Sequence, residues 1–294
     1  MENKEHDKDL TSAEEQALFS KLEFSYAKSK DDVWATLNDV LEDKPEEIVA
    51  PEKEAKIIRM NWVSMSIAAS MVLMLSYGLF ARFYTKTIQV EAGEFTSHTL
   101  PDGSQVHLNA VSTIRYAPYW WKINRKVTLE GEAFFEVEKG ERFSVHSNLG
   151  ITEVLGTKFN IYARELDYVV YCETGKVGVS NQYSEQVVLL PGQFVKLNIE
   201  ALEKETAASE KEVILSWRNN EFNYNTTPMS KVFADLERQY DITIELAEDG
   251  FAIEGYTGTM TRPDIAEEAL DAILGVYNWI YDKKGESTYL IKMK

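Results

Sequence analysis

A run of nineteen residues without a charged side chain, from Trp62 to Phe80, constrains this chain more than any other feature. As a helix that rises about 1.5 Å per residue, the run measures roughly 28 Å, close to the ~30 Å hydrocarbon core of a bilayer. A buried helix of a soluble domain usually has a polar face, and this run has only scattered serines and one tyrosine. We therefore predict one transmembrane helix at 60–82, with different compartments on its two sides.

Basic residues on the two sides of this run predict its orientation. Lys53, Lys56 and Arg59 precede it, whereas Arg82 and Lys86 follow it. The side richer in lysine and arginine usually stays in the cytoplasm. The long acidic segment before the run is also unlike the start of a cleaved signal peptide. We expect a cytoplasmic N-terminus and about 210 residues on the outer side of the membrane.

Charge and cysteine content exclude further classes of protein. The formal net charge is −17, with the acidic excess on both sides of the apolar run, so nucleic acid is not an expected partner. The single cysteine, Cys172, stands among apolar residues and is expected to be a buried small side chain rather than a reactive thiol. One cysteine cannot form an internal bridge, which excludes a disulfide framework.

The N-terminal segment, residues 1–59, carries two helix signals. Ser12–Glu15 is a capping box that predicts a short helix to about Glu23, and Ser29–Asp32 begins a second helix that ends before Pro45. Helices this short are marginal in water unless a partner covers their apolar side chains. The apolar residues of the second helix are Val33, Trp34, Leu37, Val40 and Leu41. We expect these helices to bind a partner; a small self-packed helical hairpin is the alternative.

The residues beyond the apolar run change character twice. Residues 87–198 consist of short runs in which apolar and polar residues alternate, separated by turn signals such as 101–104, which predicts an all-β domain, either a sandwich or a rolled sheet. Residues 199–212 are charged and rich in alanine, so we expect a linker there. Residues 213–294 predict a small α+β domain of β-α-β-β-α-β order, in which each helix has a threonine near its N-cap and a proline near its first turn.

Six ordered blocks within the β domain carry a family resemblance. The blocks are TLPDGSQVHLNAVSTIRY (Thr99–Tyr116), KVTLEGEAFFEVEK (Lys126–Lys139), RFSVHS (Arg142–Ser147), VLGTKFNIYA (Val154–Ala163), ETGKVGVS (Glu173–Ser180) and VLLPGQFVKL (Val188–Leu197). Together they resemble the periplasmic domain of the FecR family, membrane-bound regulators of extracytoplasmic-function sigma factors. The C-terminal pattern resembles a domain common in a subset of FecR-like proteins, itself similar to the secretin/TonB short N-terminal fold.

The resemblance implies a single-pass anti-sigma factor of the inner membrane, with residues 1–59 in the cytoplasm and the outer domains in the periplasm. An occupied TonB-dependent outer-membrane receptor would contact the periplasmic part. The signal would then pass through the span to the helices that hold the sigma factor, inhibiting it, activating it or both. The residues expected to bind the sigma factor are Leu22, Val33, Trp34, Leu37 and Leu41. Trp34 is the expected anchor, because so small a helical segment has too little interior to hide an indole.

The dipeptide Gly156-Thr157 is a candidate for self-cleavage. The resemblance implies this, because some FecR-like regulators are cut at a matching Gly-Thr bond, where the threonine hydroxyl attacks the preceding carbonyl. The alternative is a plain β-bend glycine followed by a strand threonine.

Other chemistry is scarce in this sequence. The histidines, His6, His98, His107 and His146, share no metal-ligand spacing, and we find no nucleotide-binding or hydrolase motif. We expect no enzyme activity, no cofactor and no metal. The aromatic run Tyr116–Trp121 could stack on sugars, although core or hairpin packing is the favoured interpretation. A membrane-anchored periplasmic glycan-binding or scaffold protein is therefore the alternative function, and an anchored hydrolase is a third.

Overall fold

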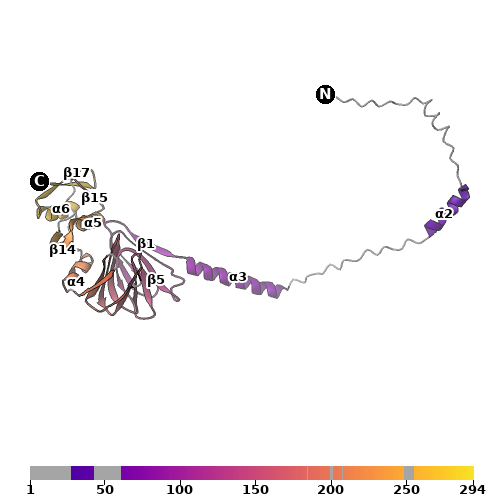
Figure 1. Ribbon diagram of the computed structural model, residues 1–294, viewed down its shortest axis with the longest axis horizontal. Helices are drawn as coiled ribbons and strands as arrows, with labels where there is room; N and C mark the ends of the chain where they lie inside the picture. Colours follow the sequence, from indigo (N-terminus) through magenta and orange to yellow (C-terminus); the bar gives the residue numbers. More distant parts are fainter. Residues whose placement is uncertain (1–27, 43–60, 184, 199–200, 207, 248–254) are drawn as a thin grey trace, which may run out of the picture. The chain divides into compact units, whose positions relative to one another are not determined.

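The computed structural model describes residues 28–42, 61–183, 185–198, 201–206, 208–247 and 255–294 (Figure 1). Its contacts divide the chain into two compact units, Met1–Asn61 and Trp62–Lys294. The expected helix that ends near Glu23, together with Leu22 and Pro45, lies outside the described residues.

In the first unit, helix α2 (Lys30–Glu42) begins where the sequence predicts. The Ser29 hydroxyl accepts a hydrogen bond from the backbone N–H of Asp32 at 3.3 Å, and the Asp32 carboxylate accepts one from the backbone N–H of Ser29 at 3.4 Å. Such a reciprocal pair satisfies backbone donors that the first turn of a helix leaves without partners. The second N-terminal helix signal is therefore confirmed.

In the second unit, helix α3 (Trp62–Phe83) is, among the described residues, the one helix long and apolar enough to cross a membrane. Its most apolar window has a mean hydropathy of 1.8, and none of that window is buried in the molecule. The core helix of a soluble domain would be covered by its neighbours, whereas a lipid-facing helix is not. Helix α3 continues through two residues into strand β1 (Lys86–Val90) (Figure 1).

The β domain is a sandwich of two sheets, and its mostly β character confirms the expected architecture. Its strands are β1, β2 (Thr96–Thr99), β3 (Gln105–Leu108), β4 (Ser112–Tyr116), β5 (Arg125–Glu136), β6 (Phe143–His146), β7 (Gly150–Val154), β8 (Lys158–Arg164), β9 (Asp167–Thr174), β10 (Val177–Asn181), β11 (Gln186–Leu189), β12 (Gln193–Asn198) and β13 (Ala201–Thr206). The first sheet has the order β1-β4-β5-β6-β7-β10-β11 and the second β2-β3-β5-β8-β9-β12-β13. Neighbours are antiparallel except β5 and β6.

Strand β5 belongs to both sheets and joins them. Its first half pairs with β4 and β6, and its second half pairs with β3 and β8. At the change of sheet, Gly131 has a φ of 103°, and a Cβ there would lie 2.5 Å from Ser112 Oγ. Glycine is needed because a residue with a side chain rarely adopts this φ and would have no space beside Ser112. The core between the sheets includes Ile114, Leu129, Phe135, Phe159 and Val170.

The turn at 101–104, part of the first block quoted above, has a structural role. Gly103 has a φ of 90°, and the Asp102 carboxylate accepts the Ser104 backbone N–H at 3.0 Å. Asp102 also forms an ion pair with Arg125, whose Nη1 donates to the Glu141 carbonyl at 2.6 Å. These contacts connect the turn to the start of β5, so the block specifies the fold rather than a reaction.

The segment 199–212, expected to be a linker, contains regular structure in its described residues. Strand β13 pairs with β12 along its full length, and helix α4 (Ala208–Leu215) follows. The segment reads as a linker because β13 is an edge strand whose Glu203, Lys204 and Glu205 are exposed, and charged side chains are common on sheet edges. Leu215 packs with Phe134 and other aromatic residues on the second sheet.

The C-terminal region has the predicted β-α-β-β-α-β order, followed by one further strand. After the 3₁₀ turn η1 (Ser216–Asn219), its elements are β14 (Glu221–Pro228), α5 (Met229–Tyr240), β15 (Thr243–Leu246), β16 (Gly255–Thr261), α6 (Ala266–Gly275), β17 (Trp279–Lys283) and β18 (Thr288–Met293). Strands β14 and β16 form one sheet, and β15, β18 and β17 form another in that order. The core of this region includes Val232, Leu236, Leu270, Ile273 and Ile291.

The threonines near the starts of the two helices in this region do not cap them. Pro228 and Ile265 occupy the N-cap positions of α5 and α6, and neither helix has a side-chain cap hydrogen bond. Thr227 and Thr261 belong instead to the ends of β14 and β16, where they continue the pairing of these strands. Strand β14 runs directly into α5, and Thr261 stands four residues before the N-cap of α6, so neither threonine occupies a cap position.

Candidate functional site

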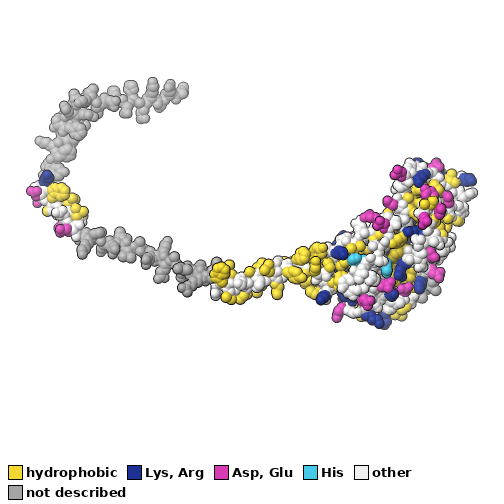
Figure 2. All heavy atoms as spheres, turned by 180° about the vertical axis from the view of Figure 1, so that it is seen from behind, with side chains coloured by type: hydrophobic (Ala, Val, Ile, Leu, Met, Phe, Trp, Pro, Cys, Tyr) yellow, Lys and Arg dark blue, Asp and Glu magenta, His cyan; other side chains and the backbone are white. Residues whose placement is uncertain are grey.

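The apolar stripe of α2 consists of Val33, Trp34, Leu37 and Leu41. All four side chains are exposed, Trp34 to 56% and Leu41 to 71%. Figure 2 shows hydrophobic and acidic side chains next to one another on this helix. In the described part of the first unit nothing covers the stripe, and an exposed cluster of this size on a short helix is typical of a surface that binds a partner.

Gly156 and Thr157 lie at the turn into β8. Gly156 has a φ of 151°, and a Cβ there would lie 2.6 Å from Lys139 Cγ and 2.7 Å from Lys139 Cα. Thr157 is buried, and its hydroxyl donates to the Lys176 carbonyl at 3.1 Å. Glycine is therefore required for the bend, as the alternative interpretation expects, and the hydroxyl must leave Lys176 before it can attack the preceding carbonyl.

The aromatic run Tyr116–Trp121 does not form a flat platform for sugars. Tyr116 and Trp121 are buried in the core of the sandwich, where their rings meet edge to face with centroids 5.5 Å apart. Tyr119 is exposed, but its ring packs against the end of α3. The favoured interpretation, core packing, holds for two members of the run, and the glycan-binding alternative loses its main support.

The described histidines and the cysteine are placed by ordinary packing. His98 Nε2 lies 2.7 Å from the Tyr116 hydroxyl, and His107 Nδ1 lies 2.7 Å from Ser97 Oγ. Among the residues that the structure describes, no group of His, Cys, Asp and Glu could hold a metal ion. Cys172 is fully buried, and burial raises the pKa of its thiol to about 11, which keeps it protonated at neutral pH.

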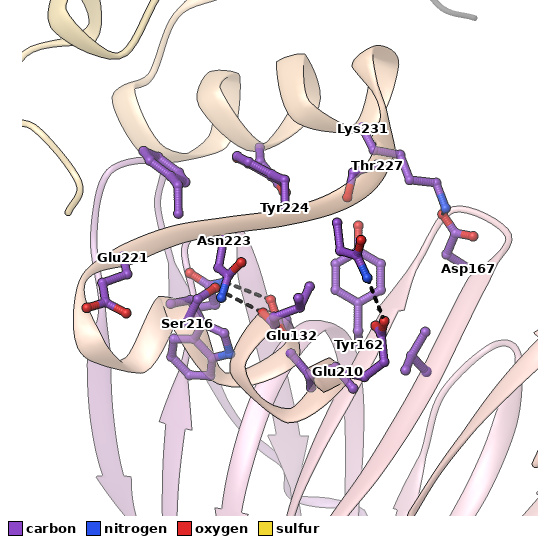
Figure 3. A pocket seen from close by; sticks show the side chains of 18 of the residues that line it. Glu132, Tyr162, Asp167, Glu210, Ser216, Glu221, Asn223, Tyr224, Thr227 and Lys231 are labelled. Carbon is purple, nitrogen blue, oxygen red and sulfur yellow. Dashed lines mark hydrogen bonds and ion pairs between the residues drawn. The ribbon is translucent and has the colours of Figure 1, made fainter. Parts of the chain in front are cut away.

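A pocket of about 390 Å³ lies between the second sheet and the C-terminal region (Figure 3). Glu132 and Tyr162, on β5 and β8, line it from below, and Tyr224 of β14 lines it from the C-terminal region. At its side, Lys231 of α5 forms an ion pair with Asp167 of β9 at 2.6 Å. The pocket therefore marks the place where the two parts of the second unit meet.

Glu132 is the most deeply buried carboxylate of this pocket, with 7% of its surface exposed. Its Oε2 accepts a hydrogen bond from Asn109 Nδ2 at 2.7 Å, and its Oε1 accepts one from Asn160 Nδ2 at 2.9 Å. Burial raises the pKa of Glu132, while the Arg164 charge and the two amides partly oppose this effect. Arg164 donates to the Ala110 carbonyl at 2.6 Å and so stays close to the same network.

The junction, as we call the contact between the β domain and the C-terminal region, continues this network. Gln239 of α5 donates from Nε2 to Asn109 Oδ1 at 2.9 Å and accepts from Arg262 Nη1 at 2.6 Å. The Gly93 N–H, in the loop after β1, donates to the Arg238 carbonyl at 2.8 Å. A chain of polar contacts therefore connects Glu132 of the sandwich with helix α5.

Aromatic contacts complete the junction. The Arg262 guanidinium lies 4.5 Å above the ring of Phe95, and Phe95 stacks on Trp217 with ring centroids 6.3 Å apart. Cation–π and stacking contacts of this kind are worth about 0.5–2 kcal/mol each. Three segments far apart in sequence thus meet at one place.

Sequence reasoning missed this polar network. Alternation along β5 places Glu132 on the same face as Phe134 and Glu136, which predicts an ordinary exposed carboxylate. It is buried because α4, η1 and the C-terminal region cover that face, and no local pattern reports such a cover. Gln239 is equally unremarkable on a helix with an apolar face towards its own core.

Two family models match the chain. The model described as FecR protein matches residues 86–178, and the model described as FecR, C-terminal matches residues 221–290. No curated protein matches.

Two crystal structures, at 2.50 and 1.65 Å resolution, of a "putative anti-sigma factor" from Parabacteroides distasonis ATCC 8503 are similar to this chain. Both share 31% sequence identity with it, at a TM-score of 0.65. The matches cover 72% and 71% of this chain and 100% and 99% of the crystallised chains. Together with the two family models, this identity shows that the chain belongs to the FecR family.

Proposed function

We propose that this chain is a single-pass inner-membrane regulator of an extracytoplasmic-function sigma factor. The observation that carries the proposal is the 31% identity, along the whole crystallised chain, with a protein described as a "putative anti-sigma factor". The FecR family is regulatory and non-enzymatic. The candidate span α3, with a helical segment before it and a β domain after it, supports an arrangement in which a signal crosses the membrane.

The proposed domains follow the elements. Residues 1–59 form the cytoplasmic segment, 60–82 the span, 87–198 the periplasmic β domain and 213–294 the C-terminal domain, with 199–212 connecting the last two. The orientation, N-terminus in the cytoplasm, is supported by the basic residues that precede α3.

The proposed sigma-factor contact is the apolar stripe of α2, with Leu22 from the preceding segment. Exposed apolar side chains on a short helix fit the groove of a partner, and the exposed indole of Trp34 offers the largest area for burial. Acidic residues of the same helix, such as Asp31 and Asp39, would attract a basic DNA-binding partner over distance.

The proposed outer partner is the signalling domain of a TonB-dependent receptor. In the C-terminal region, β15 and β17 each pair only with β18 among the described residues. A strand with one free edge can be extended by a strand of another domain. The segment 213–294 would then bind the receptor. If segment 87–212 pulls down a receptor signalling domain as well as segment 87–294 does, this role is excluded.

Self-cleavage at Gly156-Thr157 is a further proposal. The proposal rests on the resemblance of this Gly-Thr bond to the cleaved bond of some FecR-like regulators, and Gly156 has no Cβ to obstruct attack by the Thr157 hydroxyl once that hydroxyl leaves the Lys176 carbonyl. An 87–294 segment that stays intact on a denaturing gel, with no change in the cellular banding pattern on Thr157→Ala, would exclude it.

The proposed function is tested by topology and by transcription together. A periplasm-dependent reporter fused after Lys294 should be active, and the same reporter placed before Arg59 should be silent. Removal of residues 1–59 should change transcription from promoters that depend on an extracytoplasmic-function sigma factor. The reversed reporter pattern would contradict the topology, and unchanged transcription would contradict the sigma-factor role.

A further inference from the structure

The loop between β4 and β5, residues 117–124, contacts the end of α3. The ring of Tyr119 lies 5.8 Å from the ring of Phe80 and 5.3 Å from that of Tyr84, measured between centroids. The Arg82 guanidinium lies 5.6 Å from the ring of Trp120. The loop is therefore held beside the last turn of the helix that we propose as the span.

The depth of this loop follows from the length of α3. Phe80 stands eighteen residues after Trp62, which places it roughly 27 Å along the helix axis. The hydrocarbon core of a bilayer is about 30 Å thick, so a span that begins at Trp62 keeps Phe80 near the outer boundary of that core. Because Tyr119 packs against Phe80, its ring must lie at the same level.

The exposed side chains of the loop fit a lipid–water boundary. Tyr119 is 58% exposed and Ile123 is 70% exposed, and the exposed Lys122 stands between them in sequence. Tyrosine and tryptophan are enriched where bilayers meet water, and lysine favours the headgroup phosphates. Figure 2 shows apolar side chains along the whole of α3 up to the end that joins the β domain.

The loop is also built to hold this position. Trp121 anchors it from beneath, 3% exposed and edge-on to Phe143 with ring centroids 5.8 Å apart. The backbone N–H groups of Ile123 and Asn124 both donate to the Trp120 carbonyl, at 3.0 and 3.1 Å. A tight turn on a buried indole presents Ile123 outward with little conformational freedom.

We propose that residues 117–124 form a membrane-facing loop that inserts Tyr119 and Ile123 into the headgroup layer of the bilayer that α3 crosses. This inference rests on the proposed span. The β domain then has two attachments to the membrane, α3 and this loop, on either side of the short connection at Tyr84 and Thr85. A receptor that tilts the β domain must move α3 with it or pull the loop out of the lipid.

The test uses nitroxide labels on the full chain in phospholipid nanodiscs. Ile123→Cys reports the loop, Val72→Cys reports the middle of α3, and the unsubstituted chain controls for labelling of the buried Cys172. Leu166→Cys is the matched control, because Leu166 is 84% exposed in the β8–β9 turn. That turn lies at the far end of β4, where Arg164 donates to the Val111 carbonyl at 2.8 Å.

Oxygen concentrates in lipid and a nickel chelate in water, so their collision rates with the label measure its depth. We expect the oxygen-to-nickel ratio at position 123 to exceed that at position 166 severalfold, with the highest ratio at position 72. Equal ratios at 123 and 166, with a bilayer value at 72, would overturn the loop insertion and leave the span intact. A water-like value at 72 would overturn the span itself. Spin–spin broadening at position 123, without a higher oxygen-to-nickel ratio there than at position 166, would show that the loop contacts a second copy of the chain. That result would overturn the proposal.

Discussion

Replacement of Glu132 by alanine should strongly destabilise the outer part of the molecule. The change leaves the amides of Asn109 and Asn160 without their acceptor inside the junction, where each bond to the carboxylate is 2.9 Å or shorter. Hydrogen bonds to a charged group contribute about 1.5–3 kcal/mol each, so we expect a loss of about 3–5 kcal/mol. For a segment of this size, that loss corresponds to a fall in Tm of roughly 10 °C.

Replacement by glutamine should cost much less, about 1 kcal/mol. Asn160 Oδ1 is buried without a hydrogen-bond partner, so rotation of the Asn160 amide would let it accept the new glutamine N–H. The matched control is Glu130→Ala on the same strand, because Glu130 is exposed and surface substitutions usually stay within about 0.5 kcal/mol.

The pH dependence of the same variants has a definite sign. Burial raises the pKa of Glu132 above its ordinary value of 4.5, so the folded chain binds this proton more tightly than the unfolded chain. The stability that this tighter proton binding adds to the folded state is fully present below pH 4.5 and is lost as the pH rises through the folded pKa of Glu132. The wild type should therefore lose stability relative to Glu132→Gln as the pH rises from about 4.5.

Thermal unfolding of residues 86–294, followed by near-ultraviolet circular dichroism from pH 4 to 8, measures both effects. The crystallised relatives match this chain over 72% of its length, so a segment of this extent is a suitable unit. A Glu132→Ala variant as stable as Glu130→Ala would refute the network. A wild type that gains stability relative to Glu132→Gln with rising pH would refute the effect of burial on the pKa.

Two more predictions concern the bend in β5 and the junction. Gly131→Ala should lower the free energy of unfolding, measured with urea, by more than Gly192→Ala does. Both glycines have a positive φ, but of the two only Gly131 lies where a Cβ would meet other atoms, with Ser112 Cα at 2.8 Å. Gln239→Ala removes the hydrogen bonds to Asn109 and Arg262 and should speed amide hydrogen exchange at Gly93 and its neighbours, while the core strands stay protected. An equal increase in exchange across the whole β domain and C-terminal region would contradict a local effect at the junction.

The elements that the sequence predicts well are those with a local cause. The Ser29–Asp32 signal gives the start of α2 to within one residue, and the predicted span 60–82 gives both ends of α3 to within two. The sequence does not predict strand β13 at 201–206, because its charged residues are equally compatible with an edge strand and with a linker. Glu132 could not be recognised as buried, because the cover over it comes from α4, η1 and the C-terminal region, far along the chain.

The resemblance located the family from blocks that turn out to be structural. Asp102 and Gly103 form a turn that connects to Arg125, and Gly131 permits β5 to change sheets. Such residues specify a fold, so they identify relatives without revealing the surfaces that bind partners. The apolar stripe of α2 was found by a different route, the excess of apolar area on a helix with too little interior of its own.

The measurement that tests the central claim most directly is the binding of residues 1–61 to an extracytoplasmic-function sigma factor that co-purifies with the full chain. Trp34→Ala removes the largest exposed side chain of the stripe, and Glu42→Ala, at an exposed residue of α2 outside the stripe, is the matched control. Burial of a tryptophan at an interface commonly contributes about 2 kcal/mol, equivalent to roughly a thirty-fold change in affinity.

Surface plasmon resonance should show that Trp34→Ala dissociates about thirty-fold faster while its association rate hardly changes, and that Glu42→Ala keeps the wild-type dissociation rate. Circular dichroism of the free segment should be the same for both variants. Wild-type dissociation of Trp34→Ala, or no binding of the sigma factor by residues 1–61 at all, would contradict the account.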